Sequence, residues 1–313
     1  MTSRLRLLIQ NFMFVFLTYG GRIGINLGYS LPCFSCPFVH GCAGYCFLMA
    51  LQGIGPWGFG YFAQLLTYRG FQLVLWFFVF IILAILLSKL WCGWICPFGT
   101  LQDWLTQLRK KLGIRETEFS WKTRDRLKPI KYVLLAYLII IPLLIAFAGL
   151  HSDFTLPFCQ ICPARPIMPL FAGQTRYFAL DYTNTITLVF SVLSITIAAG
   201  TLIGCFFKDR FFCIFCPMLP LLQMFKKISF IRFEKSVHTC SGCGNCQRMC
   251  PMDIRDVHLE KVKQEVMSED CLLCMKCIES CPEDSTLSTK FLNRNLFSSS
   301  RKYVAENYSK GSH

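Results

Sequence analysis

One cysteine run occurs twice in the last quarter of this chain and constrains the fold more than any other feature. The copies read Cys240-x-x-Cys243-x-x-Cys246-x-x-x-Cys250-Pro251 and Cys271-x-x-Cys274-x-x-Cys277-x-x-x-Cys281-Pro282. Three closely spaced thiolates on a tight loop bind three irons of one [4Fe–4S] cube, and the fourth cysteine, followed by proline, ligates the other cube. Zinc motifs pair two CxxC units and do not triple them. The runs therefore predict two iron–sulfur clusters.

The two runs exchange their fourth ligands. We predict one cluster on Cys240, Cys243, Cys246 and Cys281, and a second on Cys271, Cys274, Cys277 and Cys250. The pattern resembles the bacterial two-cluster ferredoxins, and this resemblance implies a small α+β ferredoxin-like domain.

The whole chain is too apolar for an ordinary soluble protein. Of its 313 residues, 54% are hydrophobic and 16% are charged, and the mean hydropathy is +0.45. These values predict an α-helical membrane protein. The net charge of +14 comes from basic residues beside apolar segments. It therefore indicates contact with membrane lipid and no binding of nucleic acid.

Four apolar stretches approach the ~20 residues that a membrane-spanning helix needs. They cover residues 7–27, 71–90, 130–150 and 183–204, and we predict a four-transmembrane-helix bundle. Lys and Arg gather after the second and fourth stretches, so these loops and both termini are expected in the cytoplasm. No cleavable signal peptide is apparent. The expected location is the cytoplasmic (inner) membrane, with the ferredoxin domain on its cytoplasmic side.

The predicted organisation has four parts. Residues 1–217 form the membrane domain, 218–235 an amphipathic juxtamembrane linker, 236–292 the two-cluster ferredoxin domain and 293–313 a flexible tail.

A shorter Cys-Pro turn recurs four times in the membrane domain, each time after an apolar stretch. The copies are Cys33-x-x-Cys36-Pro37, Cys92-x-x-x-Cys96-Pro97, Cys159-x-x-Cys162-Pro163 and Cys213-x-x-Cys216-Pro217. The alternation predicts two parallel two-helix repeats, with the first and third turns outside and the others inside. Two turns together supply the four thiolates of a cube. We therefore predict an inner cluster on Cys92, Cys96, Cys213 and Cys216, and an outer one on Cys33, Cys36, Cys159 and Cys162.

Three cysteines stay outside this scheme, namely Cys42, Cys46 and Cys205. Cys42 and Cys46 replace a proposed outer ligand, bind an additional metal, or are buried thiols. Cys205 exchanges with Cys213 or is likewise a buried thiol.

The segment 92–103, with Cys213, Cys216 and the two ferredoxin runs, resembles the NapH/NosR type of membrane polyferredoxin. This resemblance implies a quinol dehydrogenase or electron conduit that feeds extracytoplasmic reductases or supplies electrons for building them. It supports the roles of Cys92, Cys96, Cys213 and Cys216. The outer Cys-Pro turns depart from NapH and suit a branch with clusters at both faces.

The sequence therefore predicts a membrane-bound electron-transfer protein that connects redox partner proteins on the cytoplasmic and outer faces. One alternative is a quinol dehydrogenase subunit with a quinone site near Arg22, Trp57, Tyr61, His40 or His151. Interfacial roles explain the same five residues. The other alternative is an accessory protein for metal reduction or reductase maturation, with Cys42 and Cys46 handling the metal.

Overall fold

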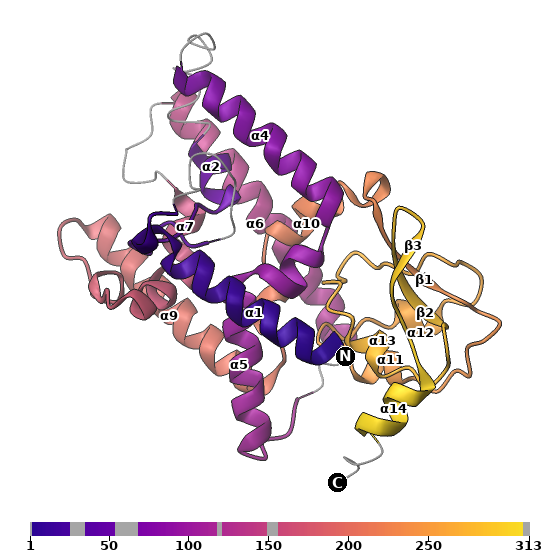
Figure 1. Ribbon diagram of the computed structural model, residues 1–313. Helices are drawn as coiled ribbons and strands as arrows, with labels where there is room; N and C mark the ends of the chain where they lie inside the picture. Colours follow the sequence, from indigo (N-terminus) through magenta and orange to yellow (C-terminus); the bar gives the residue numbers. More distant parts are fainter. Residues whose placement is uncertain (1, 26–34, 54–67, 118–120, 149–155, 309–313) are drawn as a thin grey trace.

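The computed structural model describes residues 2–25, 35–53, 68–117, 121–148 and 156–308. Long helices occupy one side of the molecule and a small sheet the other, and the start of α1 lies at their boundary (Figure 1). One hydrophobic core crosses that boundary, because Trp94 of the helical part packs in the same cluster as Phe233 of the sheet.

A long helix overlaps each predicted apolar stretch. These helices are α1 (Thr2–Tyr19), α4 (Tyr68–Leu87), α6 (Trp121–Ala148) and α9 (Thr185–Phe207). Two segments, Lys122–Leu144 and Thr185–Phe207, are long and apolar enough to cross a membrane, and only 17% of each lies buried within the protein. In α4 the apolar segment is the shorter Val74–Leu87.

The first helix is displaced from its predicted range of 7–27. It begins at Thr2 and ends at Tyr19, followed by the 3-10 turn η1 (Gly20–Ile23). A side chain at Gly20 would place its Cβ 2.8 Å from the Cβ of Ala43, so the chain turns where it packs closely against another segment.

Short helices connect the long ones, and Cys92, Cys159 and Cys213 lie within them. They are α2 (Phe47–Gly53), η3 (Trp91–Ile95), α5 (Pro97–Lys111), α7 (Pro157–Ile161), α8 (Ala164–Ile167), η5 (Met168–Ala172), η6 (Arg176–Phe178), η7 (Phe211–Ile214), α10 (Met218–Gln223) and η8 (Lys226–Ile228). Pro97 and Pro157 each begin a helix. The first N–H groups of a helix have no partner within it, so the missing N–H of proline costs no hydrogen bond there.

The sheet is antiparallel, with strand order β1-β2-β3. The strands are β1 (Ile231–Lys235), β2 (Leu287–Phe291) and β3 (Arg294–Ser298). Helices α11 (Asn245–Arg248), α12 (Asp256–Leu259), α13 (Lys276–Glu279) and α14 (Arg301–Tyr308) complete this part. We call residues 231–308 the ferredoxin module.

Two predicted segments differ in the structure. The linker 218–235 ends earlier than predicted, because residues 231–235 form β1 of the sheet, and Met218 and Leu222 of α10 are buried against the long helices. The tail is also more ordered than expected, because β3 pairs with β2 and α14 follows it. Residues 309–313 lie outside the described part.

Candidate iron–sulfur sites

The ferredoxin module brings each predicted ligand set to its own cavity. Cys240, Cys243, Cys246 and Cys281 line one cavity. Cys250, Cys271, Cys274 and Cys277 line the other, with Cys246 also in its wall. We refer to these cavities as the Cys240 site and the Cys271 site. Their composition fits two cubes that exchange their fourth ligands.

The two ligand loops have the same backbone shape built from different residues. Gly242 and Gly244 have φ values of +70° and +75°, and the corresponding Leu273 and Met275 have +50° and +61°. Glycine adopts this left-handed conformation freely, whereas Leu and Met are strained in it. Leu273 and Met275 are each 2% exposed, so their burial in the core offsets the strain.

The inner turns lie between helix ends. Cys92 is within the π-helical turn η3, Cys96 precedes α5, Cys213 is in η7 and Cys216 precedes α10. Burial raises the pKa of Cys216 well above its ordinary value, and the nearby Cys92 and Cys213 raise it further. Burial likewise raises the pKa of Cys213 to about 12. Metal binding must displace these protons, and the mutual influence of Cys216, Cys92, Cys213 and Cys96 shows that the four thiols lie near one another, as the ligands of one cube do.

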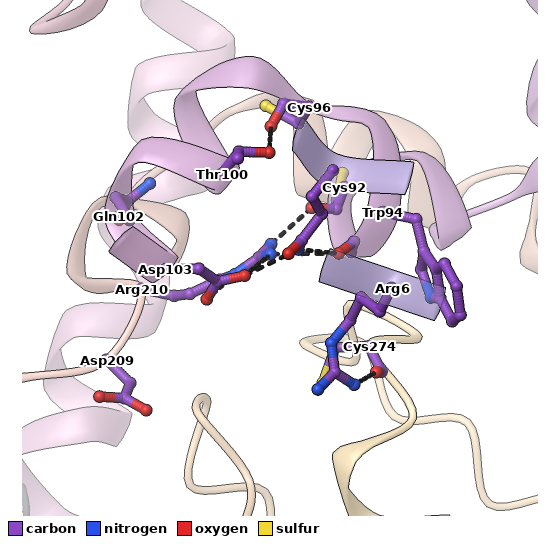
Figure 2. Close-up of polar contacts among 12 residues, drawn as sticks. Arg6, Cys92, Trp94, Cys96, Thr100, Gln102, Asp103, Asp209, Arg210 and Cys274 are labelled. Atoms are coloured by element: carbon purple, nitrogen blue, oxygen red, sulfur yellow. Dashed lines mark hydrogen bonds and ion pairs between the residues drawn. The ribbon is translucent and has the colours of Figure 1, made fainter. Parts of the chain in front are cut away.

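A buried ion pair supports the inner turn (Figure 2). Arg210 donates to both carboxylate oxygens of Asp103, at 3.0 and 2.5 Å, and to the carbonyl oxygens of Cys92 and Gly93, at 2.5 and 3.1 Å. Burial alone would raise the pKa of Asp103, but Arg210 and Lys276 hold it well below its ordinary value. The charged Arg210 therefore lies directly beside this cysteine turn.

Gln102 connects Cys213 and Cys205. Its Nε2 lies 3.7 Å from Cys213 Sγ, and its Oε1 accepts from the backbone N–H of Phe212 at 3.0 Å. The thiol of Cys205 contacts the same Oε1 at 3.7 Å and is 1% exposed. Cys205 is thus held by an amide, and Cys213 lies at the turn η7.

The inner turn touches the Cys271 site directly. A Cβ at Gly93 would lie 2.5 Å from the carbonyl oxygen of Leu272 and 3.1 Å from the backbone of Cys274. Trp94 Nε1 donates to the Leu273 carbonyl at 3.0 Å, and Arg6 donates to the Cys274 carbonyl at 2.6 Å. The two ligand loops therefore meet backbone to backbone.

The outer cysteines are grouped differently from the prediction. Cys36, Cys159 and Cys162 line one cavity together with Cys46. The predicted fourth ligand, Cys33, lies outside the described residues. Cys42 is buried in a hydrophobic cluster with Phe14 and Val39, and it does not line this cavity. The sequence analysis placed Cys46 only among the additional candidates, although the spacing Cys42-x-x-x-Cys46 repeats that of Cys92 and Cys96.

Two further observations concern the predicted alternatives. Trp57, Tyr61 and His151 lie outside the described residues, and Arg22 donates to the carbonyl of Ala172 at 2.9 Å. Over the described ranges, no three His, Cys, Asp or Glu side chains are arranged to hold a single metal ion.

Two regions of the chain match known iron–sulfur domain families. Residues 70–115 match a 4Fe-4S binding domain, and residues 232–282 match a 4Fe-4S dicluster domain. The chain is therefore an iron–sulfur protein of the ferredoxin type. Its homologues include YccM, NapH, NosR and NirI, so the resemblance to NapH and NosR is confirmed.

The similarity extends over two thirds of this chain. YccM of Escherichia coli, named for electron transport, is 29% identical over 67% of this chain and 53% of its own length. The ferredoxin-type protein NapH of Haemophilus influenzae is 27% identical over 66% of this chain and 65% of its own. The regulatory protein NosR of Pseudomonas aeruginosa is 37% identical over 21% of this chain and 9% of its own. The chain thus spans about half the length of YccM, and no solved structure matches it.

Proposed function

We propose that this chain is a membrane-bound protein that moves electrons between its ferredoxin module and an iron–sulfur cluster in its helical part. The module uses the Cys240 and Cys271 sites, and Cys92, Cys96, Cys213 and Cys216 bind the inner cluster. The four long helices span the membrane, and the termini and the module face the cytoplasm. Redox partner proteins then meet the module on that side.

The contact between the inner turn and the Cys271 loop carries this proposal. Gly93 directly follows the inner ligand Cys92, and its backbone lies against the backbone of the Cys271-site ligand Cys274. Electron transfer needs its centres close together, and two ligand loops in van der Waals contact provide such a pair.

Buried ion pairs hold the module in that position. Lys131 and Arg124 of α6 both bind Asp270, which precedes the ligand Cys271. Arg6 of α1 binds Glu279 at 3.3 Å, and Lys208 binds Asp253 at 2.7 Å. Several basic residues that the sequence analysis assigned to lipid and topology thus connect the two parts of the protein. These ion pairs fix the module against the long helices, so the distance between the Cys271 site and the inner turn stays constant, which favours electron transfer between them.

The first experiment measures iron and acid-labile sulfide in anaerobically purified protein. We expect the double variant Cys92→Ala/Cys213→Ala to lose about four irons, because a cube cannot form on two thiolates. Cys205→Ala is the matched control, since it removes a buried thiol that is not assigned to a cluster. Equal iron content in the wild-type protein and the double variant would refute the inner cluster.

The second experiment separates the two loops without touching a ligand. Gly93→Val forces the Leu272 backbone away, and overpacking of this kind costs about 1–3 kcal/mol. We expect slower oxidation of the reduced module by the inner cluster in freeze-quench EPR, with all iron retained. Gly200→Val is the control, because nothing lies within 4 Å of a Cβ there. An unchanged rate in Gly93→Val would exclude this contact as the electron path.

One cavity favours quinol oxidation as a second function. It measures about 390 Å³ and lies beside Cys250, between α1, α5 and the module. Its wall includes Asp209 and Glu279, carboxylates of the kind that accept the protons released by a quinol. Reduction of the clusters by a menaquinol analogue would support this function, and its failure with fully loaded protein would count against it.

A further inference from the structure

We propose that Cys36, Cys46, Cys159 and Cys162 hold a further [4Fe–4S] cluster, with Cys46 in the place that the sequence pattern assigned to Cys33. This inference deepens the proposed function, because it extends the electron path beyond the inner cluster. It depends on the helical part binding clusters at all, and the experiments below separate the two questions.

A single cavity brings the four thiols together. It is enclosed by Pro37, Phe38, Leu48 and Phe158 in addition to the four cysteines. Cys159 is buried, and Cys36, Cys46 and Cys162 are half-buried. Four thiols from three separate segments thus converge in a largely apolar pocket, as a cube requires.

An internal repeat assigns Cys46 independently of the cavity. Cys46 is followed by Leu51-Gln52 at the spacing at which Cys96 is followed by Leu101-Gln102. Phe158-Cys159 and Phe212-Cys213 correspond in the same way, each three residues before a Cys-Pro pair. By this alignment Cys46 corresponds to the inner ligand Cys96 and Cys42 to Cys92. Cys42 does not line the cavity, however, so the repeat supports Cys46 and the cavity supplies Cys36 as the remaining thiol.

The two glutamines make equivalent contacts. Gln52 Nε2 donates to Cys159 Sγ at 3.2 Å, and its Oε1 accepts from the N–H of Phe158 at 2.8 Å. Gln102 makes the corresponding contacts with Cys213 Sγ and the N–H of Phe212, at 3.7 and 3.0 Å. Gln52 is fully buried, so its amide has no alternative partner in water. A side-chain N–H directed at a ligand sulfur is one of the contacts that adjust cluster potentials.

Each site in the helical part also has an arginine. Arg165 lines the new cavity, with its guanidinium carbon 5.0 Å from the ring centre of Phe38 and 5.6 Å from that of Tyr177. Arg210 lies beside the inner turn, where it donates to the carbonyl of Cys92. A cluster with four thiolates carries net negative charge, so a nearby guanidinium stabilises it.

The new cavity adjoins the inner site. Pro97 and Phe98, which directly follow the inner ligand Cys96, form part of its wall. The proposed ligands Cys46 and Cys162 also pack against the same hydrophobic cluster as the inner ligands Cys92 and Cys216. The two clusters are therefore neighbours in the helical part, and an electron need not cross the ~30 Å of hydrocarbon in one step.

The test compares Cys46→Ala with Cys33→Ala in the full-length, anaerobically purified protein. We expect Cys46→Ala to lose about one to four irons, because the three remaining thiolates hold at most a [3Fe–4S] cluster, and Cys33→Ala to lose none. Mössbauer and EPR spectra of Cys46→Ala should keep the signals of the remaining clusters, which shows that the variant folds. Loss of iron in Cys33→Ala, or full retention in Cys46→Ala, would overturn the assignment.

Two further variants keep the result interpretable. Cys92→Ala/Cys213→Ala tests the inner cluster alone, so its failure to lose iron refutes the proposed function, whereas failure of Cys46→Ala alone refutes only this inference. Gln52→Leu removes the sulfur contact without removing a ligand. We expect it to retain all iron and to lower the midpoint potential of one cluster, while a purely structural glutamine would leave every potential unchanged.

Discussion

The ferredoxin module and the helical part both gather cysteines around cavities, but they do so over very different sequence distances. All eight cysteines of the module lie between Cys240 and Cys281. The helical part instead joins turns from distant segments, Cys92 with Cys213 at the inner turn and Cys46 with Cys159 at the outer cavity. Local spacing therefore defines the module sites, while helix packing defines the others.

The two regions also differ in their surroundings. Cys243 of the module is exposed, whereas the inner turn lies against the buried pair of Arg210 and Asp103. Cluster potential depends on solvent exposure and local charge. The helical sites should therefore respond strongly to single buried residues, and the Cys240 site should respond weakly.

The largest expected effect follows from Arg210→Gln. This change leaves Asp103 charged and without its main partner in a buried position, which costs about 3–5 kcal/mol. Loss of the positive charge should also lower the midpoint potential of the inner cluster. Denaturant unfolding in detergent and an EPR redox titration measure the two quantities.

The control for this variant is Arg301→Gln. Arg301 is 71% exposed and binds Glu283 at the surface of the module, so its loss should change stability by about 0–1 kcal/mol. If Arg210→Gln moved the potential of the Cys240 site as much as that of the inner site, the contrast between the two regions would be wrong.

The same contrast explains what could be predicted from the sequence. The structure brings Cys240, Cys243, Cys246 and Cys281 to one cavity because a tight loop with a following proline leaves few other arrangements. The four long helices were predictable too, since continuous apolar residues determine them. The start of α1 and the strand at residues 294–298 were missed, because tertiary contacts decide both.

Cys46 shows the opposite case. It belongs to no Cys-Pro unit, whereas Cys33 begins the unit that ends in Cys36-Pro37, so the sequence pattern favoured Cys33. Only the position of Cys46 in the fold places it in the same cavity as Cys159. Arg210 was likewise assigned to membrane topology, because its pairing with Asp103 joins residues more than a hundred positions apart. Both residues illustrate that a charge or thiol acquires its role from its packing partners.

A smaller effect is expected for the ion pairs that join the two regions. Lys208 is buried and binds Glu116 and Asp253 at 2.8 and 2.7 Å, so Lys208→Met should cost about 1.5–3 kcal/mol. Burial alone would lower the pKa of Lys208, but Asp253 and Glu116 raise it above its ordinary value. Burial also raises the pKa of Asp253, which offsets part of this gain.

The raised pKa sets the pH dependence of this pair. Lys208 stabilises the fold fully below its unfolded pKa of about 10.4, and the contribution disappears as pH rises through the higher folded value. The stability difference between wild-type protein and Lys208→Met should therefore stay constant from about pH 7 to 10 and shrink above that range. Lys128→Met, which removes an exposed pair with Asp125, is the control. A difference that grew with pH would contradict this assignment.

The smallest expected effect concerns the backbone conformation at Gly242, in the ligand loop of the Cys240 site. Gly242 has a φ of +70° and nothing within 4 Å of a Cβ, so Gly242→Ala adds backbone strain of about 1–2 kcal/mol without a clash. Gly200→Ala, in the middle of α9, should instead stabilise by about 0.5–1 kcal/mol. Urea unfolding of both variants, with the Cys240 signal followed by EPR, tests this expectation. If Gly242→Ala were neutral, the backbone conformation at Gly242 would not limit the stability of the Cys240 loop, and the strain at Leu273 in the matching loop would need no compensation by burial.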